Sequence, residues 1–150
     1  MAVEPGQPFP SFTATSHEGE VVSLSNYRGN DNLVVFFYPR ATTRGCVRET
    51  TEFGARRGEL DALKTKVVGV SVDDVTLQKE HAMQCAANFP LLCDEDKSLT
   101  TQLGILNERG MASRTTYLLD GSGVVRKVFN GVSVDGHVDE VLQAVKDLQA

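Results

Sequence analysis

The segment FFYPRATTRGCVRETTEF, residues 36–53, joins a predicted strand to a predicted helix and carries one cysteine at the junction. The run NLVVFFYP, residues 32–39, is continuously β-branched and aromatic, which is typical of a strand buried on both faces of a sheet. From about Thr43 to Lys64 the pattern becomes helical. Cys46 therefore falls in the first turn of a helix that directly follows a buried strand.

The rest of the chain extends this pattern into an α/β fold. Further strands are predicted within 19–30 (with a turn at Gly29-Asn30), at 66–72, at 89–94 and in a hairpin over 115–129 that turns at 120–123. Helices are predicted at 74–88 (capped by Asp73 or Asp74), at 96–105 and at 136–148. Strands that alternate with helices imply parallel neighbours, and the late hairpin adds antiparallel edges. The order predicts a three-layer sheet compatible with a thioredoxin-like fold, and it leaves flavodoxin-like arrangements open.

The composition is ordinary for a globular protein and excludes several classes of partner. With 150 residues, one domain over 1–150 is expected. The net charge of −5 and the pI near 5.2 argue against nonspecific binding to nucleic acid or anionic membranes. No apolar run approaches the roughly 18 residues of a membrane span, and the first residues resemble neither a secretion signal nor a transit peptide. We therefore expect a cytoplasmic protein.

The cysteines do not form a structural disulfide framework. There are three of them, Cys46, Cys85 and Cys93, at wide spacing and without a CxxC pair. A zinc ribbon and a dithiol oxidoreductase are both disfavoured, so these thiols act singly or as a long-range pair. A metal site built from His81, Cys85 and Cys93 is a weaker hypothesis, because no fourth ligand is evident.

The surroundings of Cys46 favour a reactive thiol. A helix N-terminus offers unpaired N–H groups and partial positive charge, and five arginines, at positions 40, 44, 48, 56 and 57, lie nearby in sequence. Settings of this kind lower the pKa of a cysteine from about 8.5 to roughly 3.5–7.5. The Thr43 hydroxyl can reach the sulfur or an incoming oxygen, and Pro39 can screen the site from water. The competing interpretation is an inert buried thiol beside a solvated arginine face.

These residues resemble the peroxiredoxin signature, Pro39-x-x-x-Thr43-x-x-Cys46 at the end of an aromatic-rich strand. The resemblance covers nearly the whole chain. Its other segments are GQPFPSFTATSHEGEVVSLSNYRG (6–29), VVGVSVDD (67–74), NFPLLCDED (88–96) and ASRTTYLLDGSGVV (112–125), which carries Arg114. The pattern is most similar to the peroxiredoxin Q, or bacterioferritin comigratory protein, subgroup. It implies a thioredoxin-like fold, with a central mixed sheet flanked by helices and an N-terminal β extension.

The resemblance implies a thiol-dependent peroxidase. Cys46 would attack hydrogen peroxide or an organic hydroperoxide and become sulfenic acid. Thr43, the Cys46 N–H and Arg114 would hydrogen-bond to the peroxide oxygens, while Glu49 would orient an arginine; for Glu49 the competing interpretation is a solvated helix acid. Electrons would return from thioredoxin or a similar dithiol donor, and the subgroup expectation is a monomer. No cofactor is implied, because the sulfur itself is the redox centre.

The chain departs from the family pattern at two positions. Arg44 replaces the usual proline before the Gly-Cys pair, which bears on substrate preference. Thr51 stands where many members of the subgroup carry the resolving cysteine. Other members carry that cysteine on the next helix, where Cys85 lies, although about one turn beyond the family position.

Three routes of resolution remain open. The first is a disulfide with Cys85, predicted to lie on the flank of a buried helix face formed by Val75, Ala82 and Ala86. This route requires local unwinding of the helix that bears Cys46. The second is an external thiol acting on a one-cysteine enzyme, and the third is Cys93, which otherwise reads as a buried small hydrophobe. A non-catalytic thiol redox sensor is the competing function, and sustained peroxide turnover distinguishes the two.

Overall fold

Strand β3 (Asn32–Phe37) lies inside the sheet, and every residue of it except Asn32 is buried. It pairs in parallel with β4 (Thr65–Ser71) and antiparallel with β6 (Thr115–Leu119). The computed structural model that reveals this arrangement describes residues 3–27, 29 and 31–149. The prediction of a strand buried on both faces is confirmed.

Within the described residues the sheet has seven strands, in the order β2-β1-β5-β4-β3-β6-β7. The remaining strands are β1 (Thr13–Ser16), β2 (Val21–Ser23), β5 (Leu91–Cys93) and β7 (Val125–Phe129). The helices are α1 (Arg44–Ala55), α2 (Arg57–Ala62), α3 (Val75–Cys85), α4 (Ser98–Gln102) and α5 (His137–Gln149), with a 3-10 turn η1 (Leu24–Asn26). β3, β4 and β5 run parallel and the other pairings are antiparallel. This mixed sheet confirms the predicted fold class, with β1 and β2 as its N-terminal extension.

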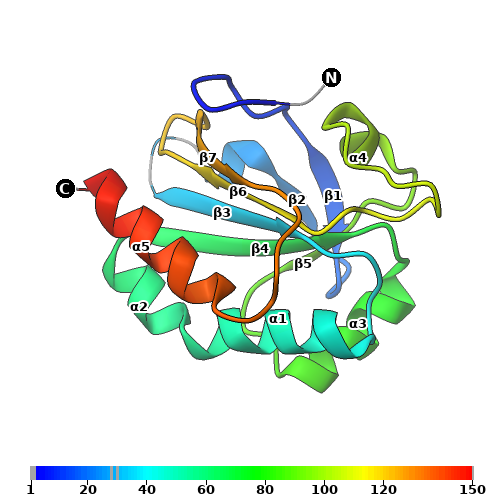
Figure 1. Ribbon diagram of the computed structural model, residues 1–150. Coiled ribbons are helices and arrows are strands. Elements are labelled where there is room, and N and C mark those ends of the chain that lie inside the picture. The colour runs from blue at the N-terminus through cyan, green and yellow to red at the C-terminus, as the bar shows by residue number, and fades with distance from the viewer. Residues whose placement is uncertain (1–2, 28, 30, 150) are drawn as a thin grey trace.

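Helices α1, α2, α3 and α5 lie on one side of the sheet, and α4 and the N-terminal segment lie on the other (Figure 1). The alternation of side chains along β3 divides the core in the same way. Val34 and Phe36 pack in the cluster that includes α1 and α5. Val35 and Phe37 pack in the opposite cluster with Phe9 from the N-terminal segment. The helix that begins next to Cys46 is therefore seated on one of two apolar cores.

The prediction of a single helix from Thr43 to Lys64 is wrong, because the segment forms two helices, α1 and α2. It is interrupted at Arg56, whose φ of −102° and ψ of 8° lie outside the α-helical range. Gly54 and Gly58 lie on either side of this interruption, and glycine has a low helix propensity.

Other predicted elements agree, with one omission. Asp74 caps α3 by accepting the Leu77 N–H at 2.9 Å, and the hairpin turn at 120–123 closes through the Gly123 N–H on the Asp120 carbonyl at 2.9 Å. Strand β1 was not predicted, because TATS has no apolar alternation; it forms by pairing with both β2 and β5. Asn30 of the predicted first turn lies outside the described residues.

Gly69 on β4 is closely packed against the aromatic core. A Cβ atom at this position would lie 2.9 Å from Leu91 Cδ2, 2.9 Å from Phe36 Cζ and 3.1 Å from Tyr38 Cε1. Real Cβ contacts are longer than this, and all three neighbours are buried. The absence of a side chain is thus what lets the Phe36 and Tyr38 rings pack over the strand.

We predict that Gly69→Ala destabilises the protein by roughly 1–3 kcal/mol, because an added methyl group overpacks this core. Gly58→Ala is the matched control, since Gly58 is exposed on α2 with nothing within 4 Å of its Cβ position. The control is expected to stabilise by up to about 1 kcal/mol through helix propensity. Denaturant unfolding of both variants measures these changes, and equal stability of the two would contradict the packing argument.

Candidate active site

Cys46 lies in the first turn of α1, just after the loop that leaves β3. Thr43 is the N-cap residue, and its carbonyl accepts a hydrogen bond from the Val47 N–H at 2.8 Å. Because Cys46 is the third residue of the helix, its own N–H has no acceptor within the helix. The side chain is buried in the core shared with α5. The sulfur therefore sits beside unpaired donors and the positive end of the helix dipole.

Arg114, in the segment that leads into β6, bridges two groups on α1. Its Nη2 donates to Cys46 Sγ at 3.3 Å, and its Nη1 donates to Glu49 Oε1 at 2.7 Å. The two acceptors lie three residues apart, on one face of the helix. Gly45 leaves room for this contact, since a Cβ there would lie 3.3 Å from Arg114 Nη2. The guanidinium is thus held against the sulfur by two hydrogen bonds, one to Cys46 and one to Glu49.

Glu49 is a buried carboxyl group rather than a solvated one. Its side chain has no exposed surface, whereas that of Arg114 is 18% exposed. Burial raises the pKa of Glu49 to about 7, and the neighbouring Arg114 opposes this rise. Glu49 Oε2 has no hydrogen-bond partner among the described residues. One oxygen of this carboxyl group therefore engages Arg114 while the other is left unsatisfied.

The loop between β3 and α1 carries the other two predicted site residues. Pro39 is half-buried where the strand ends, and Thr43 is exposed. The Thr43 hydroxyl donates to the Arg40 carbonyl at 2.8 Å, so in this state its proton is directed along the loop. Thr42 has a φ of +67°, an unusual conformation for a β-branched residue. Such a loop requires external contacts to hold its shape.

Those contacts come from the segment that begins after β4. The Ala41 N–H donates to Asp73 Oδ2 at 2.7 Å, and the Thr42 N–H donates to His81 Nδ1 at 2.7 Å. Ser71 also donates its hydroxyl to Asp73 Oδ2, at 2.7 Å. Sequence reasoning assigned no such role to Asp73 or His81. For His81, its spacing from Gln78 and Cys85 along α3 was the available signal, whereas Asp73 lies before that helix.

The predicted buried face of α3 is wrong. Val75 is only half-buried and Ala86 is exposed, whereas Gln78, His81 and Cys85 are buried along with Ala82. The polar members of this face are hydrogen bonded: Gln78 Nε2 donates to the Leu92 carbonyl at 2.7 Å, and Tyr38 donates its hydroxyl to Gln78 Oε1 at 2.5 Å. Apolar periodicity cannot identify a helix face that is buried through polar contacts.

Cys85 is correspondingly less accessible than predicted, with 6% of its surface exposed. Its thiol donates to the Val47 carbonyl at 3.5 Å, so it packs directly on α1 one residue beyond Cys46. Burial raises the pKa of the Cys85 thiol. This second thiol is therefore adjacent to the first turn of α1 and is protonated at neutral pH.

Cys93 lies on β5, where it pairs with Thr15 of β1 and Ser71 of β4. Burial raises the pKa of its thiol to about 12, and the nearby Glu95 contributes in the same direction. A thiol with so high a pKa supplies almost no thiolate at neutral pH.

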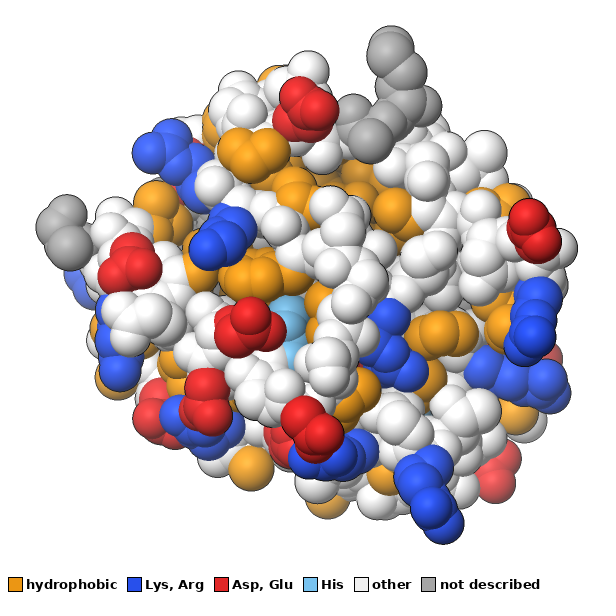
Figure 2. Space-filling model, in the orientation of Figure 1, with side chains coloured by type: hydrophobic (Ala, Val, Ile, Leu, Met, Phe, Trp, Pro, Cys, Tyr) orange, Lys and Arg blue, Asp and Glu red, His pale blue; other side chains and the backbone are white. Residues whose placement is uncertain are grey.

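Five arginines lie close to Cys46 in sequence and were interpreted as surrounding its sulfur. For three of them, Arg48, Arg56 and Arg57, this interpretation is wrong, because they form ion pairs elsewhere. Arg48 pairs with Glu52 and Asp135, Arg56 with Glu59 and Asp139, and Arg57 with Asp61. On the face shown in Figure 2, basic side chains are interspersed with acidic ones. The arginine that contacts Cys46 comes instead from position 114, far away in sequence.

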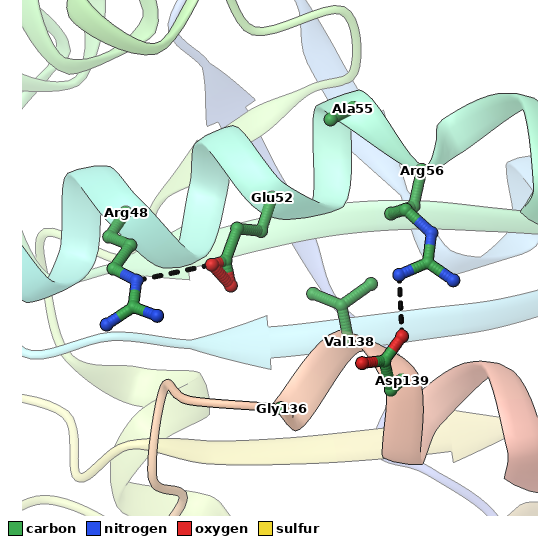
Figure 3. A pocket seen from close by; sticks show the side chains of 7 residues that line it. All are labelled: Arg48, Glu52, Ala55, Arg56, Gly136, Val138 and Asp139. Atoms are coloured by element: carbon green, nitrogen blue, oxygen red, sulfur yellow. Dashed lines mark hydrogen bonds and ion pairs between the residues drawn. The ribbon is translucent and has the colours of Figure 1, made fainter.

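Two of these surface pairs flank a cavity between α1 and α5 (Figure 3). Its volume is about 280 Å³, and Val138 and Gly136 line it from α5 and the residue before it. Arg56 Nη1 lies 2.6 Å from Asp139 Oδ1, which links the end of α1 to the beginning of α5. Exposed pairs of this kind contribute about 1 kcal/mol or less each. Only the Arg56–Asp139 pair connects the two helices, since Arg48 and Glu52 both lie on α1, and neither pair includes Cys46.

The metal hypothesis receives no support from the described ranges 3–27, 29 and 31–149. No group of three or more His, Cys, Asp or Glu side chains there could hold a metal ion. His81 uses both ring nitrogens in contacts to Thr42 and Thr50, so neither is available as a ligand.

None of the helices in the described ranges has the length and apolar character needed to cross a membrane.

Comparisons with known proteins identify the family to which the chain is related. A model described as AhpC/TSA family matches residues 5–128, a range that includes Cys46, Glu49 and Arg114. Peroxiredoxin Q, chloroplastic, from Populus jackii is 33% identical over 97% of this chain and 70% of its own length. Peroxiredoxin-2 from Bos taurus is 38% identical over 96% of this chain and 78% of its own.

A solved structure shows the same fold. The bacterioferritin comigratory protein of Xanthomonas campestris, studied for its alkyl peroxide reduction activity, aligns with a TM-score of 0.90 at 28% identity. The alignment covers 98% of this chain and 100% of that one. The thioredoxin-like arrangement of sheet and helices is thus shared along nearly the whole length of this chain.

We predict that Glu49 makes stability depend on pH. Its carboxyl group is neutral in both the folded and the unfolded chain below pH 4.5, but the unfolded chain ionises first as the pH rises to about 7. Relative to Glu49→Gln, the free energy of unfolding of the wild type should therefore fall by about 3 kcal/mol across this range. Urea denaturation of both reduced proteins measures the difference, in which titrating groups that do not interact with Glu49 cancel. A difference that stays constant with pH would contradict the prediction.

Proposed function

Because the chain belongs to the AhpC/TSA family and is a thiol peroxidase of the peroxiredoxin type, we propose that Cys46 is the thiol that attacks the peroxide. The observation that carries this assignment is the Arg114 guanidinium, which contacts Cys46 Sγ and is fixed by Glu49. A cation in a largely buried site stabilises a thiolate far better than the same cation in water. Among the described residues, no arginine donates a hydrogen bond to Cys85 or Cys93, whereas Arg114 donates one to Cys46.

The attack transfers two electrons from sulfur to the peroxide. The Cys46 thiolate bonds to the terminal oxygen of ROOH, the O–O bond breaks, and the departing RO⁻ takes a proton to become ROH. Negative charge moves from sulfur onto oxygen during this step, so donors aimed at both positions lower the barrier. Arg114 and the Cys46 N–H are the donors best placed for this. Thr43 would join them by turning its hydroxyl away from the Arg40 carbonyl.

Pro39 and Glu49 support the site without touching the substrate. Pro39 lies two residues after the end of β3, and its fixed φ restricts the direction in which the loop leaves the strand. Glu49 accepts one N–H of Arg114 and so directs the other nitrogen of the fork at the sulfur. Organic hydroperoxides are proposed as substrates beside hydrogen peroxide, in line with the alkyl peroxide reduction activity of the Xanthomonas campestris protein.

We assign Cys85 as the resolving thiol. It packs against the Val47 carbonyl, next to the residue that becomes sulfenic acid. The step is Cys46–SOH plus Cys85–SH giving Cys46–S–S–Cys85 and water. Thioredoxin or a similar dithiol would then reduce the disulfide. Cys93 is disfavoured because its thiol is buried in the sheet with a pKa of about 12.

Intact mass and peptide mapping after one equivalent of hydrogen peroxide test both thiol assignments. We expect the wild type to lose two hydrogens with a Cys46–Cys85 crosslink, and Cys46→Ser to lose all turnover. Cys85→Ser should gain one oxygen at Cys46, while Cys93→Ser, the control, should behave as the wild type. An added oxygen at Cys46 of the wild type with two free thiols would instead indicate a one-cysteine enzyme resolved by an external thiol. Oxidation at Cys46 without sustained turnover would indicate a sensor.

We predict that Arg114→Ala slows the reaction of Cys46 with hydrogen peroxide by about 10²–10³-fold, because it removes a donor that follows the moving charge. Stopped-flow kinetics under single-turnover conditions report this step directly. Arg126→Ala is the matched control, since Arg126 is a half-exposed arginine on β7 that pairs with Asp120. A rate for Arg114→Ala within twofold of the control would remove Arg114 from the mechanism.

A further inference from the structure

His81 is a buried histidine that the peroxidase chemistry does not use. It has no exposed surface and lies on the inner face of α3. Its ring stacks on that of Tyr38, with centroids 4.9 Å apart and an angle of 22° between the planes. Nδ1 accepts the Thr42 N–H at 2.7 Å, and Nε2 lies 3.0 Å from Thr50 Oγ1. One side chain thus joins α3 to the active-site loop and to α1.

The direction of both hydrogen bonds follows from the first of them. Since Nδ1 accepts a backbone N–H, the neutral ring carries its proton on Nε2, which donates to Thr50 Oγ1. Burial lowers the pKa of His81 to about 4, with Asp73 opposing, so the ring is neutral at physiological pH. Both nitrogens are then satisfied without any water or ion.

The two partners of His81 straddle Cys46. Thr42 lies four residues before it in the loop, and Thr50 lies four residues after it in the second turn of α1. Thr42 is also the loop residue with a φ of +67°, a conformation that persists only where the surroundings impose it. The His81 contacts therefore fasten the segment whose shape places Cys46 against Arg114.

Disulfide formation would require this segment to change. Cys46 Sγ is directed at Arg114, on the sheet side, whereas Cys85 Sγ is directed at the Val47 carbonyl from α3. Two sulfurs must come within about 2.05 Å of each other to bond, so Cys46 has to leave Arg114 and the first turn of α1 has to rearrange. Contacts at Thr42 and Thr50 hold that turn in its reduced geometry.

We propose that His81 is a positioning residue that latches the active-site loop and α1 in the reduced state and releases them when Cys46 bonds Cys85. The proposal rests on the assignment of Cys85 as the resolving thiol. A latch present only in the reduced state favours that state, and so makes the disulfide easier to reduce. Its removal shifts the thiol–disulfide equilibrium toward the disulfide.

Redox titration against a thiol buffer, with the oxidised fraction determined by mass, measures this equilibrium. Thr50→Val and His81→Asn remove the same hydrogen bond from its two ends, and asparagine keeps an acceptor for the Thr42 N–H. Each variant is expected to shift the equilibrium constant about tenfold toward the disulfide, equivalent to about 30 mV. Because they delete one shared contact, the double variant should shift it about as far as either single one.

Thr100→Val is the matched control. Thr100 is also a fully buried threonine, on helix α4 at the other side of the sheet. Its hydroxyl donates a hydrogen bond to Asp94 Oδ2 at 2.6 Å. Its loss should lower stability in both redox states and leave the equilibrium constant unchanged. A purely structural role for His81 would give this same pattern, with lower stability and no redox shift.

The outcomes separate the inference from the function on which it rests. If the wild type forms the Cys46–Cys85 disulfide but Thr50→Val and His81→Asn stay within twofold of Thr100→Val, the latch is overturned and the resolving assignment stands. If the wild type forms no such disulfide, the resolving assignment fails and the latch fails with it. Should His81→Asn not fold, Thr50→Val alone decides, because it leaves the histidine and the loop contact in place.

Discussion

The guanidinium of Arg114 is the group around which the site is organised. A largely buried guanidinium is stable only when its N–H donors have acceptors. Here two of those donors are paired on α1, one with the carboxyl group of Glu49 and one with the sulfur of Cys46. Because the guanidinium is a planar fork, its contacts fix the rotation of α1 about its own axis: a turn of one residue, about 100°, would carry either Glu49 or Cys46 out of reach. The register of the whole helix over the sheet is therefore tied to one side chain from the segment before β6.

Helix α3 holds the opposite side of α1 by a different principle. Gln78, His81 and Cys85 recur at helical spacing and face inward, where each makes a hydrogen bond with another element. Apolar side chains could fill the same volume, but they would accept many nearby arrangements. Directional contacts define one arrangement and are lost together when it changes. In the cycle proposed above, in which Cys46 leaves Arg114 to bond Cys85, such contacts serve the site better than a tighter apolar core would.

The parts of this protein that follow from local pattern could be predicted from the sequence. The buried run that forms β3 was predicted from a single segment, and the place of Cys46 after it followed. The cap of α3 was narrowed to Asp73 or Asp74, of which Asp74 is the one that caps the helix. The arginine partner was predicted only through the resemblance to peroxiredoxins, because nothing local links Arg114 to Cys46. Nearness in sequence misled where it was used alone: Arg48 and Arg56 pair with acids at the surface. The inner face of α3 escaped detection because its buried residues are polar, and β1 because it exists only through its two neighbours.

The two outer strands of the sheet have a further consequence for how the molecule meets others. β2 is only three residues long, and β7 carries the exposed side chains of Arg126 and Lys127. A short strand offers few free peptide groups, and adjacent positive charges repel a like strand laid alongside. Neither border of the sheet is thus a good template for strand addition. The molecule is thereby protected from joining its neighbours edge to edge into aggregates, also when the first turn of α1 opens as the proposed cycle requires.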